Sequence, residues 1–333
     1  MYSGYLSAIM IVTFVLSVVI FLLDVASLVN IFEQILLIAC MGISYDYFSG
    51  STGYQNLGFG AFVALGAYVL VFGSNAGLAL PLSVLLAGVL SSAVSLAISY
   101  PFLRVKGAYF AIASLTLVLL LEVADTNLYS FTGGTGGVRL LYSNAILHSG
   151  LYFGLVALTL FCLYFHLFLS RSLLGLAMKS IKEDETVAQS FGVNSFRVKQ
   201  TAMAISAFFG GLTGALFAIY LGFINVSNVL GIGIAMYPVI ASLIGGAGIF
   251  LGPMIGGLIL VFANIGLPVI MYSLNSFLSA GPLIVTGVIL LIVGLFLPGG
   301  ILRVRYFRKF SEQKVDPLFA LVSRRKKRQH MPV

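Results

Sequence analysis

Apolar runs of about twenty residues recur along almost the whole chain, and no other feature of the sequence restricts its fold as strongly. The hydrocarbon core of a bilayer is about 30 Å thick, and a helix needs about 20 residues to cross it. We count ten such runs: 6–23, 28–48, 55–73, 78–99, 107–124, 150–169, 199–222, 232–247, 249–270 and 281–297. The sequence predicts an all-α fold, a polytopic bundle of about ten transmembrane helices.

Two details of this pattern leave alternatives open. The run 232–247 is short and rich in glycine, so the count is nine or ten, and a Gly-rich piece could be re-entrant. The first run follows Met1 without a basic segment or a small-residue cleavage site, so we expect a retained anchor. Segments of about ten residues with alternating polarity, which outer-membrane barrels require, are missing from the sequence.

Basic residues gather on one side of the predicted bundle, as the positive-inside rule requires of cytoplasmic loops. With ten spans and a cytoplasmic N-terminus, the following fall inside: Arg104, Lys106, Arg171, Lys179, Lys182, Arg197, Lys199 and the tail 303–333. Of the 18 Lys and Arg residues, Arg139 alone falls outside. We therefore expect a multi-pass protein of the cytoplasmic membrane with a transmembrane domain over 1–302, a basic tail over 303–333 and both termini in the cytoplasm.

The net charge of +8 has a simple explanation in this topology, because the basic tail "SRRKKRQ" suits the anionic lipid of the inner leaflet better than a nucleic acid. Cys40 and Cys162 lie inside apolar runs and behave as small hydrophobes. Three histidines are scattered without ligand spacing: His148, His166 and His330. No P-loop is present. We expect no catalytic site, no metal and no cofactor bound by this chain.

The stretch "KSIKEDETVAQSFG", residues 179–192, concentrates five charged side chains in a chain that is 8% charged. Each charge would cost about 3 kcal/mol inside the bilayer, so the stretch lies outside it. Ser180 and Glu183 have capping-box spacing, and Gly192 is placed as a helix stop. The apolar residues fall in one predicted stripe: Ile181, Ala188 and Phe191. The pattern predicts a short amphipathic cytoplasmic helix over 180–191.

Glycine, with 37 residues, forms clusters at 50–68, at 132–137 and at 243–260. Glycine at small-xxx-small spacing, as around Gly60 and Gly256, favours close packing of helices. Adjacent glycines such as Gly245 and Gly246 also favour unwound backbone at membrane depth, which is tolerated where it lines a cavity or is buried in protein. We favour packing for the first cluster and weigh the two interpretations equally for the third.

The segment "SRSLLGLAMKSIKEDETVAQSFGVNSFRVKQ" resembles the EAA-type cytoplasmic loop of ABC importer permeases, in particular of the branched-chain amino acid permease family, M-subunit type. Further motifs resemble that family in order: "STGYQNLGFGAFVALGAY", "LRVKGAYFAIASLTL", "TGGTGG", "GGAGIFLGP" and "FLPGGIL". The resemblance covers about 35–302. Lys182 stands where the family usually has Arg, Ser180 where it has Ala, and Asn56 where it often has Ser.

The resemblance implies an ABC importer permease fold and a non-enzymatic subunit that pairs with a second homologous permease, docks two ABC ATPase subunits and receives substrate from an extracytoplasmic binding protein. ATP and Mg would be bound by the ATPase subunits. The loop at about 170–199 would transmit ATPase movement to the spans. Its coupling residues would be the following: Gly175, Ser180, Ile181, Lys182, Glu183, Glu185, Ala188 and Gly192.

The substrate path is not marked by a motif of its own, so its candidate residues are chosen by residue type and position. An apolar amino acid needs a mostly apolar route with a few polar anchors and helix breaks whose amides take a carboxylate. The candidates are the following: Tyr54, Asn56, Tyr109, Glu122, Gly245 and Gly246. The expected cargo is a branched-chain or other small amino acid, with urea or short amides as the alternative. An ion-coupled transporter or channel subunit, with Glu33, Asp46 or Glu122 as a proton site, is the rival hypothesis.

Overall fold

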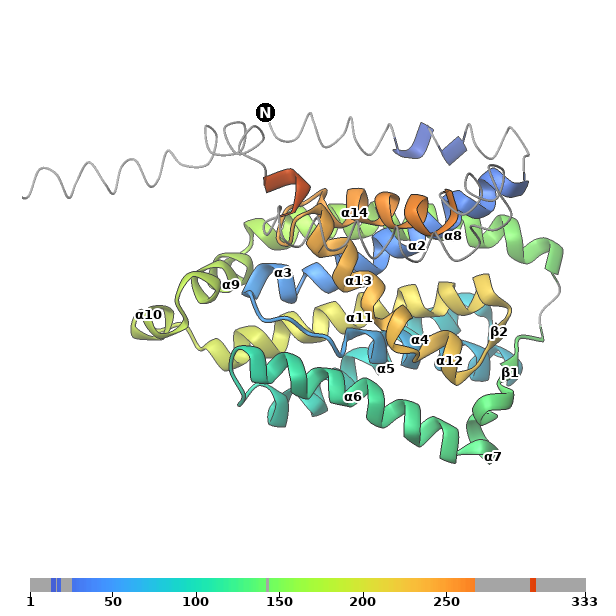
Figure 1. Cartoon of the computed structure of the whole chain (residues 1–333), viewed down its shortest axis with the longest axis horizontal. Coiled ribbons are helices and arrows are strands. Elements are labelled where there is room, and N and C mark those ends of the chain that lie inside the picture. The colour runs from blue at the N-terminus through green and yellow to red at the C-terminus, as the bar shows by residue number, and fades with distance from the viewer. Residues whose placement is uncertain (1–12, 16, 19–25, 142–143, 267–299, 304–333) are drawn as a thin grey trace, which may run out of the picture.

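The computed structural model describes residues 13–15, 17–18, 26–141, 144–266 and 300–303, and these form a helical bundle (Figure 1). The helices are α2 (Ala26–Asp46), α3 (Ser49–Thr52), α4 (Phe59–Asn75), α5 (Leu80–Phe102), α6 (Ala108–Asn127), α7 (Tyr129–Thr132), α8 (Asn144–Arg171), α9 (Leu173–Glu183), α10 (Glu185–Ser190), α11 (Ser195–Leu221), α12 (Val226–Val229), α13 (Ile232–Gly245) and α14 (Gly252–Val261). Shorter pieces are the 3-10 turns η1 (Gly134–Gly136) and η4 (Ile301–Arg303), the π-helical η2 (Phe262–Gly266), and the strands β1 (Val138–Arg139) and β2 (Phe223–Ile224).

Six helical segments in the described part are long and apolar enough to cross a membrane: Ser27–Thr52, Leu80–Phe102, Ala108–Asn127, Gly150–Arg171, Ser195–Leu221 and Val226–Gly245. Two shorter apolar helices, Phe59–Asn75 and Gly252–Asn264, accompany them. The predicted helical bundle is confirmed, whereas the predicted count of about ten is not reached within the described residues. The run 281–297 and most of 6–23 lie outside them.

The bundle has two distinct ends (Figure 1). One, called here the α10 end, carries α3, α9, α10 and the turn between α13 and α14. The other, the β1 end, carries α7, η1 and a two-stranded antiparallel pair in which Val138 faces Ile224 and Arg139 faces Phe223. Arg139 is thus at the end opposite to Lys182 and Lys199, which agrees with the uneven distribution of charge seen in the sequence.

Helix α11 occupies the centre of the bundle and approaches its neighbours through glycine. A Cβ placed on Gly66 of α4 would lie 2.2 Å from the carbonyl oxygen of Gly211, and one on Gly214 would lie 1.9 Å from that of Val63. Because no Cβ fits at such distances, these glycines are what lets the backbones of α4 and α11 meet. In the same way a Cβ on Gly60 would lie 2.6 Å from Ala235 Cβ, so packing explains Gly60 and Gly66 of the first glycine cluster. Gly53 in that cluster ends α3 with a left-handed φ of +79°, and the backbone over 53–58 is not helical.

The third cluster forms a break rather than a continuous helix. Helix α13 ends at Gly245 and α14 begins at Gly252, and Gly246 and Gly248 between them have φ angles of +118° and +81°. The break lies at the α10 end of the bundle and not halfway along a span (Figure 1). Gly256 beyond it is a packing position, since a Cβ there would lie 1.8 Å from the carbonyl oxygen of Ala241. Packing and unwound backbone thus fall on different glycines of this cluster, and the location of the break at membrane depth stays a prediction.

We expect Gly214→Ala to destabilise the protein by about 1–3 kcal/mol, because the added methyl group forces α11 away from α4. The loss is measured as the fraction that remains monodisperse in size-exclusion chromatography after heating in detergent. Gly233→Ala in α13 is the matched control, since a Cβ there meets nothing within 4 Å. Equal heat resistance of the Gly214 variant and the control would contradict this account of the packing.

Candidate functional site

The charged stretch forms two short helices, not the single helix predicted over 180–191. Helix α9 begins after Ser172, whose side chain accepts a hydrogen bond from the Gly175 amide at 3.1 Å. At Asp184 the backbone becomes extended, with φ −158° and ψ 113°. The Asp184 carboxylate then caps α10 by accepting from the amides of Thr186 at 2.8 Å and Val187 at 3.1 Å.

The predicted capping box is therefore wrong. Ser180 lies inside α9 and donates its hydroxyl to the Ala177 carbonyl at 2.8 Å, and Glu183 is the last residue of that helix. Ser172 caps α9 and Asp184 caps α10 instead. Ser and Asp are about equally good N-cap residues, so residue type alone does not distinguish these positions from Ser180. The predicted stop at Gly192 is confirmed, because its φ of +85° is left-handed.

The predicted apolar stripe also differs from the structure. Ile181 and Ala188 are each 3% exposed and pack inward, whereas Phe191 is 85% exposed. The segment α9–α10 presents another group of apolar side chains to the outside, called here the exposed set: Leu173, Leu176, Val187 and Phe191. Ile181 and Ala188 thus attach α9–α10 to its own bundle, where burial removes their apolar surface from water.

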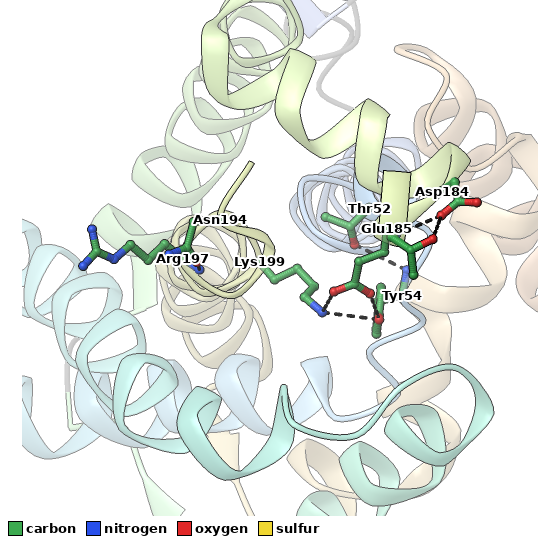
Figure 2. A network of polar contacts seen from close by, with 8 residues as sticks. Thr52, Tyr54, Asp184, Glu185, Asn194, Arg197 and Lys199 are labelled. Carbon is green, nitrogen blue, oxygen red and sulfur yellow. Dashed lines mark hydrogen bonds and ion pairs between the residues drawn. The ribbon is translucent and has the colours of Figure 1, made fainter. Parts of the chain in front are cut away.

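A polar network attaches α10 to the rest of the protein (Figure 2). The Lys199 ammonium of α11 forms an ion pair with Glu185 Oε1 at 2.7 Å, and Tyr54, from the loop between α3 and α4, donates its hydroxyl to Glu185 Oε2. The ammonium also donates to the Tyr54 hydroxyl at 3.3 Å and lies 4.3 Å from the centre of its ring. Lys199 is 2% exposed and the Glu185 side chain 12%, so this is a buried ion pair that joins three elements.

The network keeps Glu185 ionised. Burial raises the pKa of this carboxyl, but the hydrogen bonds from Lys199 and Tyr54, together with the charges of Lys199 and Lys106, lower it further, so the net pKa is below the ordinary value. The pKa of Tyr54 is raised by burial and by the hydrogen bond to Glu185. Because the folded-state pKa of Glu185 is depressed, its contribution to stability is present at neutral pH and is lost only as the pH falls through that pKa.

A second contact holds the end of α9. Lys182 donates its ammonium to the backbone carbonyl of Gly50 in α3. A Cβ placed on Gly53 would lie 3.3 Å from the Lys182 side chain, so the chain around α3 lies close against α9. Of the predicted coupling residues, Lys182 and Glu185 thus face the bundle, whereas Glu183 is exposed. Gly175 is a close-packing position, since a Cβ there would lie 2.0 Å from the carbonyl oxygen of Leu169.

The structure does not bring the predicted substrate-path residues together. Tyr54 belongs to the network with Glu185, Tyr109 is 74% exposed on α6, and Glu122 is half-buried near the β1 end. Asn56 is 1% exposed; its Oδ1 accepts from the Gly58 amide at 3.1 Å, and its Nδ2 has no hydrogen-bond partner among the described residues. Gly245 and Gly246 form the end of α13 and the turn after it.

Sequence reasoning missed several polar partners. Asp125 of α6 is 6% exposed and accepts from the Tyr68 hydroxyl of α4 at 2.6 Å, a pairing over a separation that no local pattern reveals. Of the three proton-site candidates of the rival hypothesis, Glu33 and Asp46 are fully buried in α2, whereas Glu122 of α6 is half-buried. Within the described ranges no group of three or more His, Cys, Asp and Glu side chains is placed to hold a metal ion.

We expect Lys199→Met to loosen α10, because Glu185 then stays partly buried without its cation. The protection of the α10 amides against hydrogen exchange should fall by roughly tenfold to a hundredfold, which corresponds to about 1.4–2.8 kcal/mol. Lys179→Met, on an exposed side chain of α9, is the matched control and should leave that protection unchanged. Unchanged protection in the Lys199 variant would show that the ion pair does not hold the helix.

Comparisons with known proteins agree with this architecture. Residues 27–293 match the family model described as "Branched-chain amino acid transport system / permease component". The high-affinity branched-chain amino acid transport system permease protein LivM of Salmonella typhimurium is 30% identical over 227 residues, which is 59% of this chain and 53% of that protein. LivM of Escherichia coli is 30% identical over 232 residues, 61% of this chain and 53% of that protein.

A probable branched-chain amino acid transport permease protein LivM of Methanocaldococcus jannaschii is 24% identical over 280 residues, 80% of this chain and 79% of that protein. The alignments with the two bacterial proteins thus span about half of the length of each. No solved structure matches the chain. Since the family model covers most of the sequence, this multi-pass membrane protein belongs to the family of branched-chain amino acid transport permease components.

Proposed function

We propose that the chain is the permease subunit of an ATP-driven ABC importer, which moves branched-chain amino acids across the cytoplasmic membrane by alternating access. It is a transport subunit and not an enzyme. It pairs with a second homologous permease, docks two ABC ATPase subunits that bind ATP and Mg, and receives its substrate from an extracytoplasmic binding protein. We assign the permease domain to residues 1–302. The tail 303–333, of which the structure describes residue 303 alone, is proposed to bind anionic lipid through its basic side chains.

The observation that carries this proposal is the construction of α9–α10. The segment lies at the α10 end of the bundle, is stiffened by its own caps, and is attached through the ion pair of Lys199 with Glu185. It also presents the exposed set to a partner. A coupling element needs this combination, because force passes only through a stiff body that is attached firmly on one side and accessible on the other.

The sidedness of the proposal follows from the positive-inside rule. Four basic residues lie at or near the α10 end: Arg104, Lys182, Arg197 and Lys199. Helix α11 bonds to the end of α5 through Gln200 and Ser99, α9 bonds to α3 through Lys182, and Lys199 of α11 pairs with Glu185 of α10. Arg139 lies in β1. The α10 end then faces the cytoplasm, where ATPase subunits reside, and the β1 end faces the binding protein.

The substrate class is taken from the family and from the printed names of the relatives, which are branched-chain amino acid permeases. An apolar amino acid suits a bundle whose interior is mostly apolar. Other small amino acids, urea and short amides are the alternatives that a ligand measurement on the associated binding protein distinguishes.

For the complete transporter in proteoliposomes, we expect uptake of radiolabelled leucine to require ATP on the ATPase side and to survive collapse of the proton gradient. Removal of ATP should abolish uptake, whereas an uncoupler should leave most of it. The reverse pattern, uptake without ATP that an uncoupler stops, would support the rival ion-coupled transporter, with Glu33, Asp46 or Glu122 as its proton site.

We expect Phe191→Asp to abolish co-purification of the ATPase subunits, because a charge replaces the exposed aromatic side chain that directly follows α10 at an apolar contact. The matched control is Leu141→Asp, on a residue that is 76% exposed near the β1 end. The control should retain the ATPase subunits in the same amount as the unmodified protein. Retention by both variants would exclude the exposed set as the docking surface.

A further inference from the structure

Asp46 ends helix α2 with a carboxylate that is fully buried. The position is unfavourable for a negative charge, because the C-terminal end of a helix already carries partial negative charge and burial removes water from the carboxylate. The contacts around the side chain offset this cost. Asp46 Oδ1 accepts from the Ser242 hydroxyl at 2.7 Å, and Oδ2 accepts from the Gly248 amide at 2.8 Å.

Both donors belong to the end of α13 and the turn that follows it. Ser242 lies in the last turn of α13, and Gly248 lies in the break before α14. The carboxylate therefore joins α2 to the turn between α13 and α14 across nearly 200 residues of sequence, a separation of 196 for Ser242 and 202 for Gly248. Hydrogen bonds to an ionised group are stronger than those between neutral groups, so this junction is firm.

The segment α9–α10, called here the coupling segment, contacts the surroundings of Asp46 through Lys182. Its ammonium bonds to the carbonyl of Gly50 and acts electrostatically on the Asp46 carboxylate. Glycine positions show how close the groups lie: a Cβ on Gly50 would lie 2.0 Å from Asp46 Oδ1, and one on Gly248 would lie 2.9 Å from Lys182 Nζ. The end of α9, helix α3, the end of α2 and the α13–α14 turn thus converge on one carboxylate.

One further segment rests on this turn. A Cβ on Gly300, which directly precedes η4, would lie 2.4 Å from the backbone nitrogen of Gly246 and 2.8 Å from the carbonyl oxygen of Leu243. The backbone at Gly300 is therefore seated on the end of α13 and the α13–α14 turn without intervening side chains. A displacement of the turn carries this segment with it, because backbone in direct contact has no room to yield.

We propose that Asp46 is a positioning residue for coupling, which transmits movement of α9 through Lys182 to the α13–α14 turn. The inference rests on the proposed function of α9–α10 and adds the route by which that segment acts on the bundle. The ion pair of Glu185 with Lys199 attaches α10 to α11, and the Asp46 junction attaches α9 to α13 and α14. The coupling segment is thus held at two separate points on two different parts of the bundle.

The test uses the complete transporter, with its partner permease, ATPase subunits and binding protein, reconstituted in proteoliposomes. The measured quantity is the number of leucine molecules taken up per ATP hydrolysed. We expect Asp46→Asn to lower this ratio about tenfold while the ATPase subunits stay bound and hydrolyse ATP. The two donors meet different oxygens of Asp46, so in the variant one of them faces an NH2 group that cannot accept, and the side chain carries no charge for Lys182. Lys182→Met should lower the ratio by a similar factor.

The double variant separates a shared route from two independent defects. If both residues act through one junction, combining Asp46→Asn with Lys182→Met lowers the ratio no further than either change alone, whereas independent effects multiply. Asp125→Asn is the matched control, a buried carboxylate that accepts from Tyr68 away from the junction, and its ratio should stay within twofold of the unmodified protein.

An unchanged ratio in Asp46→Asn, or multiplied losses in the double variant, would overturn the inference. Should Asp46→Asn fail to fold, Ser242→Ala replaces it, since that change keeps the Asp46 charge and removes one hydrogen bond. We expect Ser242→Ala to lower the ratio of leucine to ATP roughly threefold. An unchanged ratio in this variant would overturn the inference. Failure of the proposed function has a different signature, because the unmodified protein would then neither retain ATPase subunits nor require ATP for uptake.

Discussion

The close approach of α11 to α4 is the constraint on which the rest of the structure depends. Gly66 and Gly214 let the two backbones meet at distances that no side chain would permit, and Gly211 does the same toward α5, where a Cβ would lie 2.5 Å from the carbonyl oxygen of Ala87. In a bilayer, apolar side chains gain little by leaving lipid for protein, so close backbone contact supplies much of the attraction between helices. Because α11 is fixed in this way, Lys199 in its second turn is fixed as well, and the ion pair with Glu185 has a rigid base.

The fold class, the positions of most helices and the family could be predicted from the sequence, because apolar runs and glycine clusters are local signals. Details of α9–α10 could not. Ser172, Ser180 and Asp184 are all good N-caps, and only tertiary packing, which buries Ile181 and Ala188, selects the first and the last. The same packing divides the predicted apolar stripe, because Ile181 and Ala188 face the bundle while Phe191 is exposed. Helical spacing alone does not reveal which surface covers each apolar residue.

Polar pairs between residues far apart in the sequence could not be predicted for another reason. Tyr54 looked like a substrate anchor because it is an aromatic residue with a polar tip beside a glycine cluster, yet its partner Glu185 is 131 positions away. Asp46 and Asp125 likewise find their partners on helices whose neighbourhood depends on the whole topology. A single sequence shows that a buried carboxylate needs a donor, but not which helix supplies it.

The five charges of the stretch 179–192 divide into two groups with different tasks. Lys182, Asp184 and Glu185 are engaged within the protein: they bind α3, cap α10 and pair with Lys199. Lys179 and Glu183 are exposed. A docking surface made mainly of these two charges would be weak in water, since exposed ion pairs contribute little. In the proposed docking to an ATPase subunit, affinity would then come from apolar side chains such as Phe191, and the exposed charges would set register and exclude wrong partners.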